Sequence, residues 1–311
     1  MQKESLKFID LFSGCGGLSK GFELAGWKCV GFVEFWQPAI DTHLTNCDGD
    51  LIGRDITQIS DEVVEKYKYK VQCIVGGPPC QGFSMAGNRD PNDPRNRLFE
   101  HFVRFVRIIE PEFFVMENVA SIGSMRNAEG RLVIAEIFNA FKELGYSIQC
   151  KVLNSSNYGV PQTRRRAIFI GNRIGYPIKY PGFIKKVFLK EILDLPYEQV
   201  PEKQHIYDKI STAMNYKFSH VPEGKNYGLF RSNYKKPKLN AFCCTVTKSG
   251  RYIHPIYNRL LSVREVARVQ SFPDDYVFCG AVKDMYMQIG NAVPVNMAQA
   301  IGKTVMESYN E

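Results

Sequence analysis

The chain has 311 residues, of which 44% are hydrophobic, so it can bury a sizeable core in one large or two unequal domains. It contains no apolar run near the roughly 20 residues of a membrane span, and no signal-peptide pattern. Nine scattered cysteines favour a reducing compartment over a disulfide framework, and the five histidines show no metal-ligand spacing. We therefore expect a cytoplasmic protein without a structural metal.

The net charge of +8 is unevenly distributed. Residues 179–258 hold 14 Lys and Arg against 6 Asp and Glu, and the remainder holds 26 of each. This segment is also rich in Tyr, Asn and Pro with little helical periodicity, which predicts a second, irregular domain. A solvated basic face is the simpler interpretation of the charge, and a surface that meets phosphates is the functional one.

The chain begins with a pattern typical of a nucleotide-binding βαβ unit. A short apolar strand over 6–12 runs into Gly14, Gly16 and Gly17, and the amphipathic helix that follows ends at Gly26. Glycines at such a turn let backbone N–H groups approach a ligand at the helix N-terminus. A tight turn that binds no ligand would show the same sequence pattern. The glycine spacing differs from G-x-G-x-x-G, which argues against a dinucleotide.

Two acids follow at the ends of expected strands. A second strand over 27–33 ends at Glu34, and Asp55 lies past the end of a third. An acid after the second strand usually holds a ribose diol, whereas Asp55 could meet the amine of an adenine or cap the helix after it. The order of glycine turn, Glu34 and Asp55 favours a nucleoside-containing cofactor over two surface acids.

Cys80 is the candidate nucleophile. The apolar run 71–75 predicts a buried strand, and two glycines and two prolines then fix a rigid turn that carries Cys80. Reacting groups collect at the carboxyl ends of strands in open α/β sheets, whereas an ordinary cysteine is a small buried hydrophobe. The polar stretch 87–97 predicts an exposed loop beside it that can close over a substrate.

Charged side chains also mark two later strands. A helix over 98–109 precedes an apolar strand that delivers Glu117, an acid that is costly to bury without a reason. With Cys80, Glu117 suggests a nucleophile paired with a proton donor. Strand alternation further on puts Arg164 and Arg166 on one face, where they could bind an anion or a carbonyl, or simply protect a sheet edge from aggregation.

Regular structure returns near the C-terminus. Residues 243–252 predict a strand and a tight turn. A helix over 262–270 is expected to start at Ser262, with Glu265 completing a capping box. Residues 288–294 then lead into a final helix.

Six motifs stand in a characteristic order along the chain. They are Asp10-Leu11-Phe12-Ser13-Gly14 with Gly16-Gly17, Pro78-Pro79-Cys80-Gln81, Glu117-Asn118-Val119, Gln162-Thr163-Arg164-Arg165-Arg166, Arg264-Glu265-Val266-Ala267-Arg268-Val269-Gln270-Ser271-Phe272-Pro273 and Gly290-Asn291-Ala292-Val293-Pro294. Over nearly its whole length the chain thereby resembles the bacterial C5-cytosine-specific DNA methyltransferases of restriction–modification systems. The resemblance implies an α/β, Rossmann-like methyltransferase sheet with helices on both faces. It places a catalytic and cofactor-binding domain at 1–178, completed by 284–311, and a smaller target-recognition domain at 179–283.

The resemblance also implies a role for each catalytic position. Cys80 would add to C6 of the cytosine, Glu117 would hydrogen-bond the ring at N3 and the amine, and Arg166 would hold the base carbonyl with Arg164 beside it. Thiolate addition at C6 is needed because C5 of cytosine is a poor nucleophile until the ring becomes enamine-like. The base must leave the duplex stack to reach the thiol, and the loop over 84–97 would close over it.

S-adenosylmethionine is the cofactor that the resemblance implies, with S-adenosylhomocysteine as its product. Phe12 would pack on the adenine, Glu34 would take the ribose diol, and Asp55 would meet the adenine edge, with either Phe35 or Trp36 covering the ring. The full set of implied cofactor contacts is Phe12, Gly14, Gly16, Gly17, Glu34, Phe35, Asp55, Ile56, Pro78, Leu98 and Asn291.

Double-stranded DNA would be the substrate, with the basic segment on the phosphates and a few side chains in the major groove. We expect a monomer of bacterial or phage origin, with a restriction endonuclease acting on the same site as its partner. The expected DNA contacts are Gln81, Ser84, Thr245, Thr247, Arg251 and Tyr252.

Three other interpretations compete with this one. The first is an RNA cytosine methyltransferase on the same scaffold, but the tRNA-modifying relatives carry a Cys-Phe-Thr signature where this chain has Cys243-Cys244-Thr245. The second is a non-catalytic DNA-binding regulator, which the presence of Cys80, Glu117 and Arg166 disfavours. The third is a nicotinamide dehydrogenase, against which the glycine spacing argues.

Overall fold

The computed structural model describes residues 5–79, 98–127, 129–193, 226–229, 232–248, 252–257 and 259–310. The chain divides into two compact units. The first unit comprises Met1–Leu153, Arg165–Gly182 and Ala298–Glu311, and the second comprises Asn154–Arg164 and Phe183–Met297. The division after Gly182 lies near the domain boundary that we expected, but 154–164 and 284–297 fall in the second unit, where we had assigned them to the catalytic domain.

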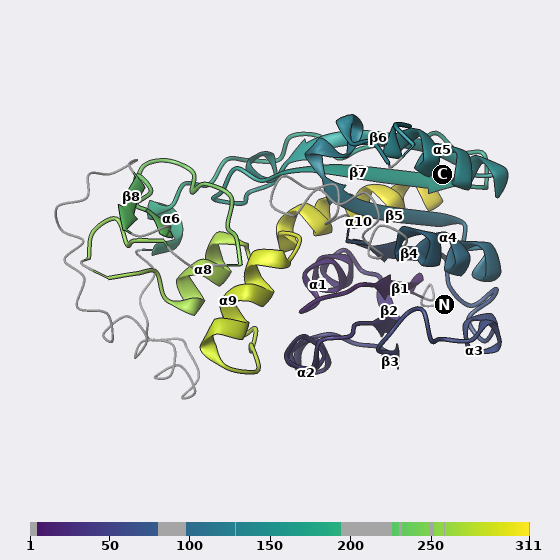
Figure 1. Ribbon diagram of the computed structural model, residues 1–311, viewed down its shortest axis with the longest axis horizontal. Helices are drawn as coiled ribbons and strands as arrows, with labels where there is room; N and C mark the ends of the chain where they lie inside the picture. The colour runs from purple at the N-terminus through teal and green to yellow at the C-terminus, as the bar shows by residue number, and fades with distance from the viewer. Residues whose placement is uncertain are drawn as a thin grey trace. The chain divides into compact units, whose positions relative to one another are not determined.

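One seven-stranded sheet in the order β3-β2-β1-β4-β5-β7-β6 forms the centre of the first unit (Figure 1). Its strands are β1 Lys7–Leu11, β2 Lys28–Val33, β3 Asp50–Gly53, β4 Cys73–Gly76, β5 Phe113–Val119, β6 Ser147–Asn154 and β7 Arg165–Asn172. The five strands from β3 to β5 pair in parallel, and β7 runs antiparallel to β5. The strand order runs outward from β1 in both directions, so the topological switch point lies between β1 and β4, where ligands of doubly wound folds bind.

Helices cover both faces of this sheet, as the sequence predicts. On one face, α4 (Leu98–Ile109) and α5 (Val133–Glu143) bury an aromatic cluster in which Phe114 stacks on Phe141 with 3.9 Å between ring centroids. The pleat sends Phe8 to the opposite face, where it packs on Phe22 of α1 (Gly17–Leu24) at 5.4 Å. The remaining helices of the first unit are α2 Gln37–Asn46, α3 Asp61–Glu65 and the 3₁₀ segment Ala120–Ser124.

The final helix, α10 (Val295–Tyr309), is tied to the first unit by its C-terminal part. The Trp27 indole N–H donates to the carbonyl of Gly302 at 2.9 Å, and Phe113 packs on Tyr309. These two contacts join the end of the chain to β2 and β5.

The second unit has short elements, in keeping with its irregular sequence pattern. They are α6 Lys190–Leu193, the antiparallel pair β8 Asn226–Leu229 and β9 Ser232–Lys235, α8 Val263–Val269 and α9 Val282–Asn291. The capping box is confirmed: the Glu265 N–H donates to Ser262 Oγ at 3.2 Å, and the Ser262 N–H donates to Glu265 Oε2 at 2.7 Å. We did not predict helix α9, since we expected 288–294 only to lead into the final helix.

The described ranges contain neither a helix that could span a membrane nor a cluster of metal ligands. Among those residues, no helix combines the length and apolarity that crossing a membrane requires. In the same part of the chain, His, Cys, Asp and Glu side chains form no group of three or more arranged to hold a metal ion.

Candidate active site

The glycine turn after β1 has an unusual backbone. Phe12 adopts φ of 61°, a left-handed conformation that is uncommon for a bulky residue and is retained only where the surroundings impose it. Gly14 and Gly16 follow with φ of 55° and 87°, and Gly16 is the N-cap of α1. The Ser13 N–H donates to the carbonyl of Val33 at 3.1 Å, so the turn is fixed to the end of β2.

Glu34 is built into the same turn. Its side chain is buried, with Oε2 accepting from the Gly14 N–H and Oε1 from the Trp36 N–H, each at 2.9 Å. Burial raises the pKa of Glu34, although these two N–H groups favour its charged form. The structure therefore brings together the glycine turn and the acid that the sequence predicts for one ligand.

The other predicted cofactor residues have more varied surroundings. Phe35 is 75% exposed, so its ring is accessible to a ligand. Asp55 is also exposed, and its Oδ1 accepts from the N–H and hydroxyl of Thr57 at 2.9 and 2.8 Å, which lowers the pKa of Asp55. Ile56 is buried in the hydrophobic core, so its side chain belongs to the interior. Leu98 packs against the same core.

Asp10 heads a polar network that the sequence did not reveal. The Ser19 hydroxyl donates to Asp10 Oδ2 at 2.6 Å and lies 3.0 Å from His43 Nε2, and all three side chains are fully buried. Burial raises the pKa of Asp10 to about 7 and lowers the pKa of His43 to about 3. The network joins β1 to α1 and α2 around the glycine turn. Its only sequence signal is an acid within an apolar strand.

The turn after β4 lies directly against Glu117. A Cβ atom added to Gly77 would lie 3.1 Å from Glu117 Oε2, and the Asn118 amide donates to the carbonyl of buried Pro78 at 3.2 Å. Cys80, Gln81 and Ser84, which follow this turn, lie outside the described residues. The segment that leads to Cys80 is thus packed against the acid predicted to act with it.

Glu117 and Arg166 form an ion pair. Arg166 Nε lies 2.7 Å from Glu117 Oε1, and the two side chains are 16% and 14% exposed. The pairing follows from the register of β5 and β7, which sets Val119 opposite Arg166 and Glu117 opposite Ile168. Glu117 and Arg166 therefore lie on one face of the sheet, two positions apart on neighbouring strands.

Arg164 differs from the prediction. Strand β7 begins at Arg165, so Arg164 lies before it and belongs to the second unit. Its buried guanidinium donates from Nη1 to the carbonyl of Val246 at 2.8 Å and from Nη2 to that of Asn291 at 3.4 Å. Arg164 thus anchors two backbone segments of the second unit, and this role differs from the one expected beside Arg166.

Two buried glutamines join further backbone segments of the second unit by hydrogen bonds. Gln162 Nε2 donates to Gln270 Oε1 at 2.5 Å, while Gln162 Oε1 accepts from the Val246 N–H at 2.8 Å. Gln270 Nε2 donates in turn to the carbonyl of Ile289 at 2.6 Å. Sequence reasoning quoted both glutamines only as parts of motifs, because their partners lie far away along the chain.

The predicted DNA contacts divide into accessible and buried residues. Thr247 is exposed, and Thr245 is half-buried with its hydroxyl donating to the carbonyl of Thr163 at 2.7 Å. Tyr252 is 2% exposed, and its hydroxyl accepts from the Thr247 N–H at 2.7 Å and donates to the Thr245 carbonyl at 3.0 Å. Tyr252 therefore anchors the turn, and its contact with DNA stays a prediction. Arg251 lies outside the described residues.

The fold is a doubly wound α/β sheet in which a glycine turn holds a buried acid at the ends of β1 and β2, and an acid–arginine pair joins β5 to β7. The chain matches the C-5 cytosine-specific DNA methylases over residues 6–307 and belongs to that family. It is accordingly a DNA cytosine-5 methyltransferase of the restriction–modification type.

Named relatives support the assignment. The chain is 38% identical to the type II methyltransferase M1.HphI of Haemophilus parahaemolyticus, across 97% of this chain and 87% of that protein. It is 36% identical to M.DdeI of Desulfomicrobium norvegicum, across 96% and 88% respectively. A protein described as a DNA modification methyltransferase encoded within an E. coli prophage has a solved structure with a TM-score of 0.80, 29% identity and coverage of 99% and 100%. Spodoptera frugiperda DNMT2, at 21% identity and a TM-score of 0.69 with coverage of 97% and 100%, shares the fold.

Proposed function

We propose that the protein transfers a methyl group to C5 of a cytosine that is flipped out of duplex DNA, through a covalent bond between Cys80 and C6. The observation that carries the proposal is the Glu117–Arg166 ion pair, whose carboxylate lies against Gly77 in the turn that leads to Cys80. An acid and a guanidinium are the groups that cytosine chemistry needs at its N3 edge and its carbonyl.

The proposed reaction takes one methyl group from the cofactor, gives up the C5 proton and regenerates Cys80. The Cys80 thiolate forms a bond to C6, and the displaced π electrons make C5 nucleophilic. Glu117 donates its carboxyl proton to N3 and accepts from the exocyclic amine, and Arg166 donates to the carbonyl oxygen, so both stabilise the charge that the ring gains. After C5 gains its methyl group, water takes the C5 proton, the C6–S bond breaks with its electron pair returning to the Cys80 thiolate, and the C5=C6 double bond returns. Base flipping is required because the thiol cannot reach C6 within the stack.

The residues at the carboxyl ends of β1 and β2 fit S-adenosylmethionine. Glu34 is a buried carboxylate that backbone N–H groups hold in place, so its oxygens can accept from the two hydroxyls of a ribose. Phe12 is held in a conformation that a bulky residue rarely adopts. Phe35 presents an exposed ring next to Glu34, and Asp55 presents a carboxylate past β3. When bound, S-adenosylmethionine would supply an activated methyl group and leave as S-adenosylhomocysteine. Asn291, Pro78 and the glycines of the turn complete the proposed set.

DNA recognition is assigned to the second unit, with catalysis and all of the proposed cofactor contacts except Asn291 in the first. The basic segment 179–258 supports this division, because a polyanion is bound mainly through its phosphates. Gln81 and Ser84 would contact DNA near the flipped base, and Thr245, Thr247 and Arg251 would contact it from the second unit. We further propose a monomeric enzyme that shares its recognition site with a restriction endonuclease, as the type II names of its relatives suggest.

Bisulfite sequencing of genomic DNA from cells expressing the protein tests this proposal. Wild-type protein should protect cytosines in one short sequence context, and Cys80→Ala should protect none while retaining cofactor binding. Cys150→Ala, which removes a half-buried thiol in β6, is the matched control and should protect as wild type does. Appreciable protection by Cys80→Ala would refute the covalent route. Methyl transfer to tRNA but not to duplex DNA would contradict the proposed substrate.

A further inference from the structure

A braced hairpin in the second unit carries two exposed apolar side chains. Residues 252–257 and 259–261 form its arms, in which Ile253 bridges Leu260 and the Leu261 N–H donates to the Tyr252 carbonyl at 2.7 Å. At its tip, Ile256 is 54% exposed and Tyr257 is 57% exposed. Single exposed apolar residues are ordinary, but here two adjacent ones lie on a turn whose backbone is hydrogen-bonded to a buried side chain.

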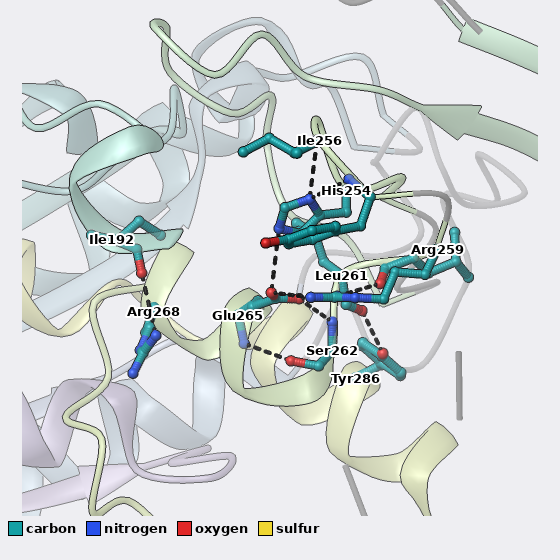
Figure 2. A network of polar contacts seen from close by, with 11 residues as sticks. Ile192, His254, Ile256, Arg259, Leu261, Ser262, Glu265, Arg268 and Tyr286 are labelled. Carbon is teal, nitrogen blue, oxygen red and sulfur yellow. Dashed lines mark hydrogen bonds and ion pairs between the residues drawn. The ribbon is translucent and has the colours of Figure 1, made fainter. Parts of the chain in front are cut away.

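His254 is hydrogen-bonded to the backbone of the tip. Its buried ring accepts at Nδ1 from the N–H groups of Ile256 and Tyr257, at 3.1 and 3.0 Å. Because Nδ1 accepts twice, the proton of the neutral ring is on Nε2, which lies 3.4 Å from Glu265 Oε1. Figure 2 shows Ile256 on the side of His254 opposite Glu265.

Arg259 completes the brace. Its guanidinium makes two parallel hydrogen bonds to the buried Glu265 carboxylate, at 2.6 and 2.8 Å, and lies 5.4 Å from the centre of the Tyr257 ring. The His254 ring packs on Tyr257 with 4.7 Å between centroids. Buried charged groups contribute little net stability, and their best-attested use is to specify one geometry. Here that geometry is the shape of an exposed tip.

The charge around the hairpin identifies the kind of partner. Between Glu223 and Glu265 the sequence holds nine Lys and Arg and no acid, and seven of them remain when buried Arg264 and Arg259, which is paired with Glu265, are set aside. Such a stretch repels basic surfaces and attracts a polyanion. Duplex DNA also offers deoxyribose and thymine methyl groups to an isoleucine, and deoxyribose and phosphates to a tyrosine.

We propose that the 254–257 tip is a DNA-contacting element, in which Ile256 and Tyr257 pack on the duplex while His254, Glu265 and Arg259 hold them in place. The inference rests on the proposed function, since it presupposes that the second unit binds DNA. It assigns an apolar contribution to binding that the basic residues alone do not supply.

The test compares full-length wild type with the double variant Ile256→Ala/Tyr257→Ala in duplex DNA binding at several salt concentrations. Kd should rise about tenfold, as expected for the loss of two partly buried apolar side chains from an interface, while the slope of log Kd against log salt stays unchanged because no charge is removed. Tyr69→Ala is the matched control: Tyr69 is 81% exposed in the first unit with Lys68 over its ring, and its loss should leave Kd unchanged.

Cofactor binding and urea unfolding should be the same for the double variant and wild type. DNA affinity of the double variant within twofold of wild type, or an equal loss in Tyr69→Ala, would overturn the inference while leaving methylation by the wild type intact. Failure of the wild-type protein to methylate duplex DNA would instead overturn the proposed function.

Discussion

Replacing Gly77 by alanine would insert a methyl group between the turn that leads to Cys80 and the carboxylate of Glu117. The new Cβ would lie 3.1 Å from Glu117 Oε2, so the carboxylate must shift by a few tenths of an ångström. Arg166 restrains that shift through its 2.7 Å ion pair with Oε1. Since a misplacement of 1 Å costs roughly a hundredfold in rate, a shift of this size should lower kcat about four- to tenfold.

Stability should hardly change in this variant. Gly77 is not among the glycines with positive φ, so alanine gains about 0.4–1 kcal/mol from the unfolded chain, which offsets most of the mild crowding. The assay is single-turnover methylation of duplex DNA together with urea unfolding. Gly123→Ala is the control, because a Cβ there meets nothing within 4 Å. A rate for Gly77→Ala within twofold of that control would refute the proposed coupling between the turn and Glu117.

Three further predictions follow from the described contacts. Gly290→Ala would place a Cβ 2.4 Å from the backbone of Thr247 and Lys248, so urea unfolding should show a loss of about 1–3 kcal/mol, and an unchanged midpoint would contradict the packing. Burial raises the pKa of Asp10 from 3.8 to about 7, so the stability of the wild type falls as the pH rises from about 4 to 7. Asp10→Asn should remove this loss, which is on the order of 2–4 kcal/mol. If the stability of the variant changed with pH in the same way as that of the wild type, the prediction would be refuted. DNA affinity should fall at least about tenfold between about 50 and 200 mM salt, and a flat response would mean that the basic segment is merely solvated.

Features set by neighbouring residues were predictable from the sequence. The helix expected over 98–109 is α4 with the same bounds, because its apolar period is strong and local. The capping box at Ser262 is confirmed for the same reason, since both of its hydrogen bonds lie within three residues. The glycine turn and Glu34 were predicted as parts of one site because βαβ geometry brings the ends of adjacent parallel strands together.

Features set by distant partners were not predictable. Strand alternation placed Arg164 with Arg166, but the guanidinium of Arg164 is bound to carbonyls 82 and 127 residues away in sequence. The Asp10–Ser19–His43 network depends on how α1 and α2 pack on β1. No local pattern records such packing.

Covalent trapping tests the central claim most directly. A duplex carrying 5-fluorocytosine at the mapped target cannot release its C5 substituent as a proton, so the enzyme should remain bonded to C6 after methyl transfer. Mass spectrometry of the digested complex should place the DNA on Cys80. Cys244 is the informative alternative, because its hydrogen bond with Cys243 lowers the pKa of its thiol. An adduct on Cys80 that is absent from Cys80→Ala would bear out the account, whereas methylation without an adduct, or an adduct on Cys244, would contradict it.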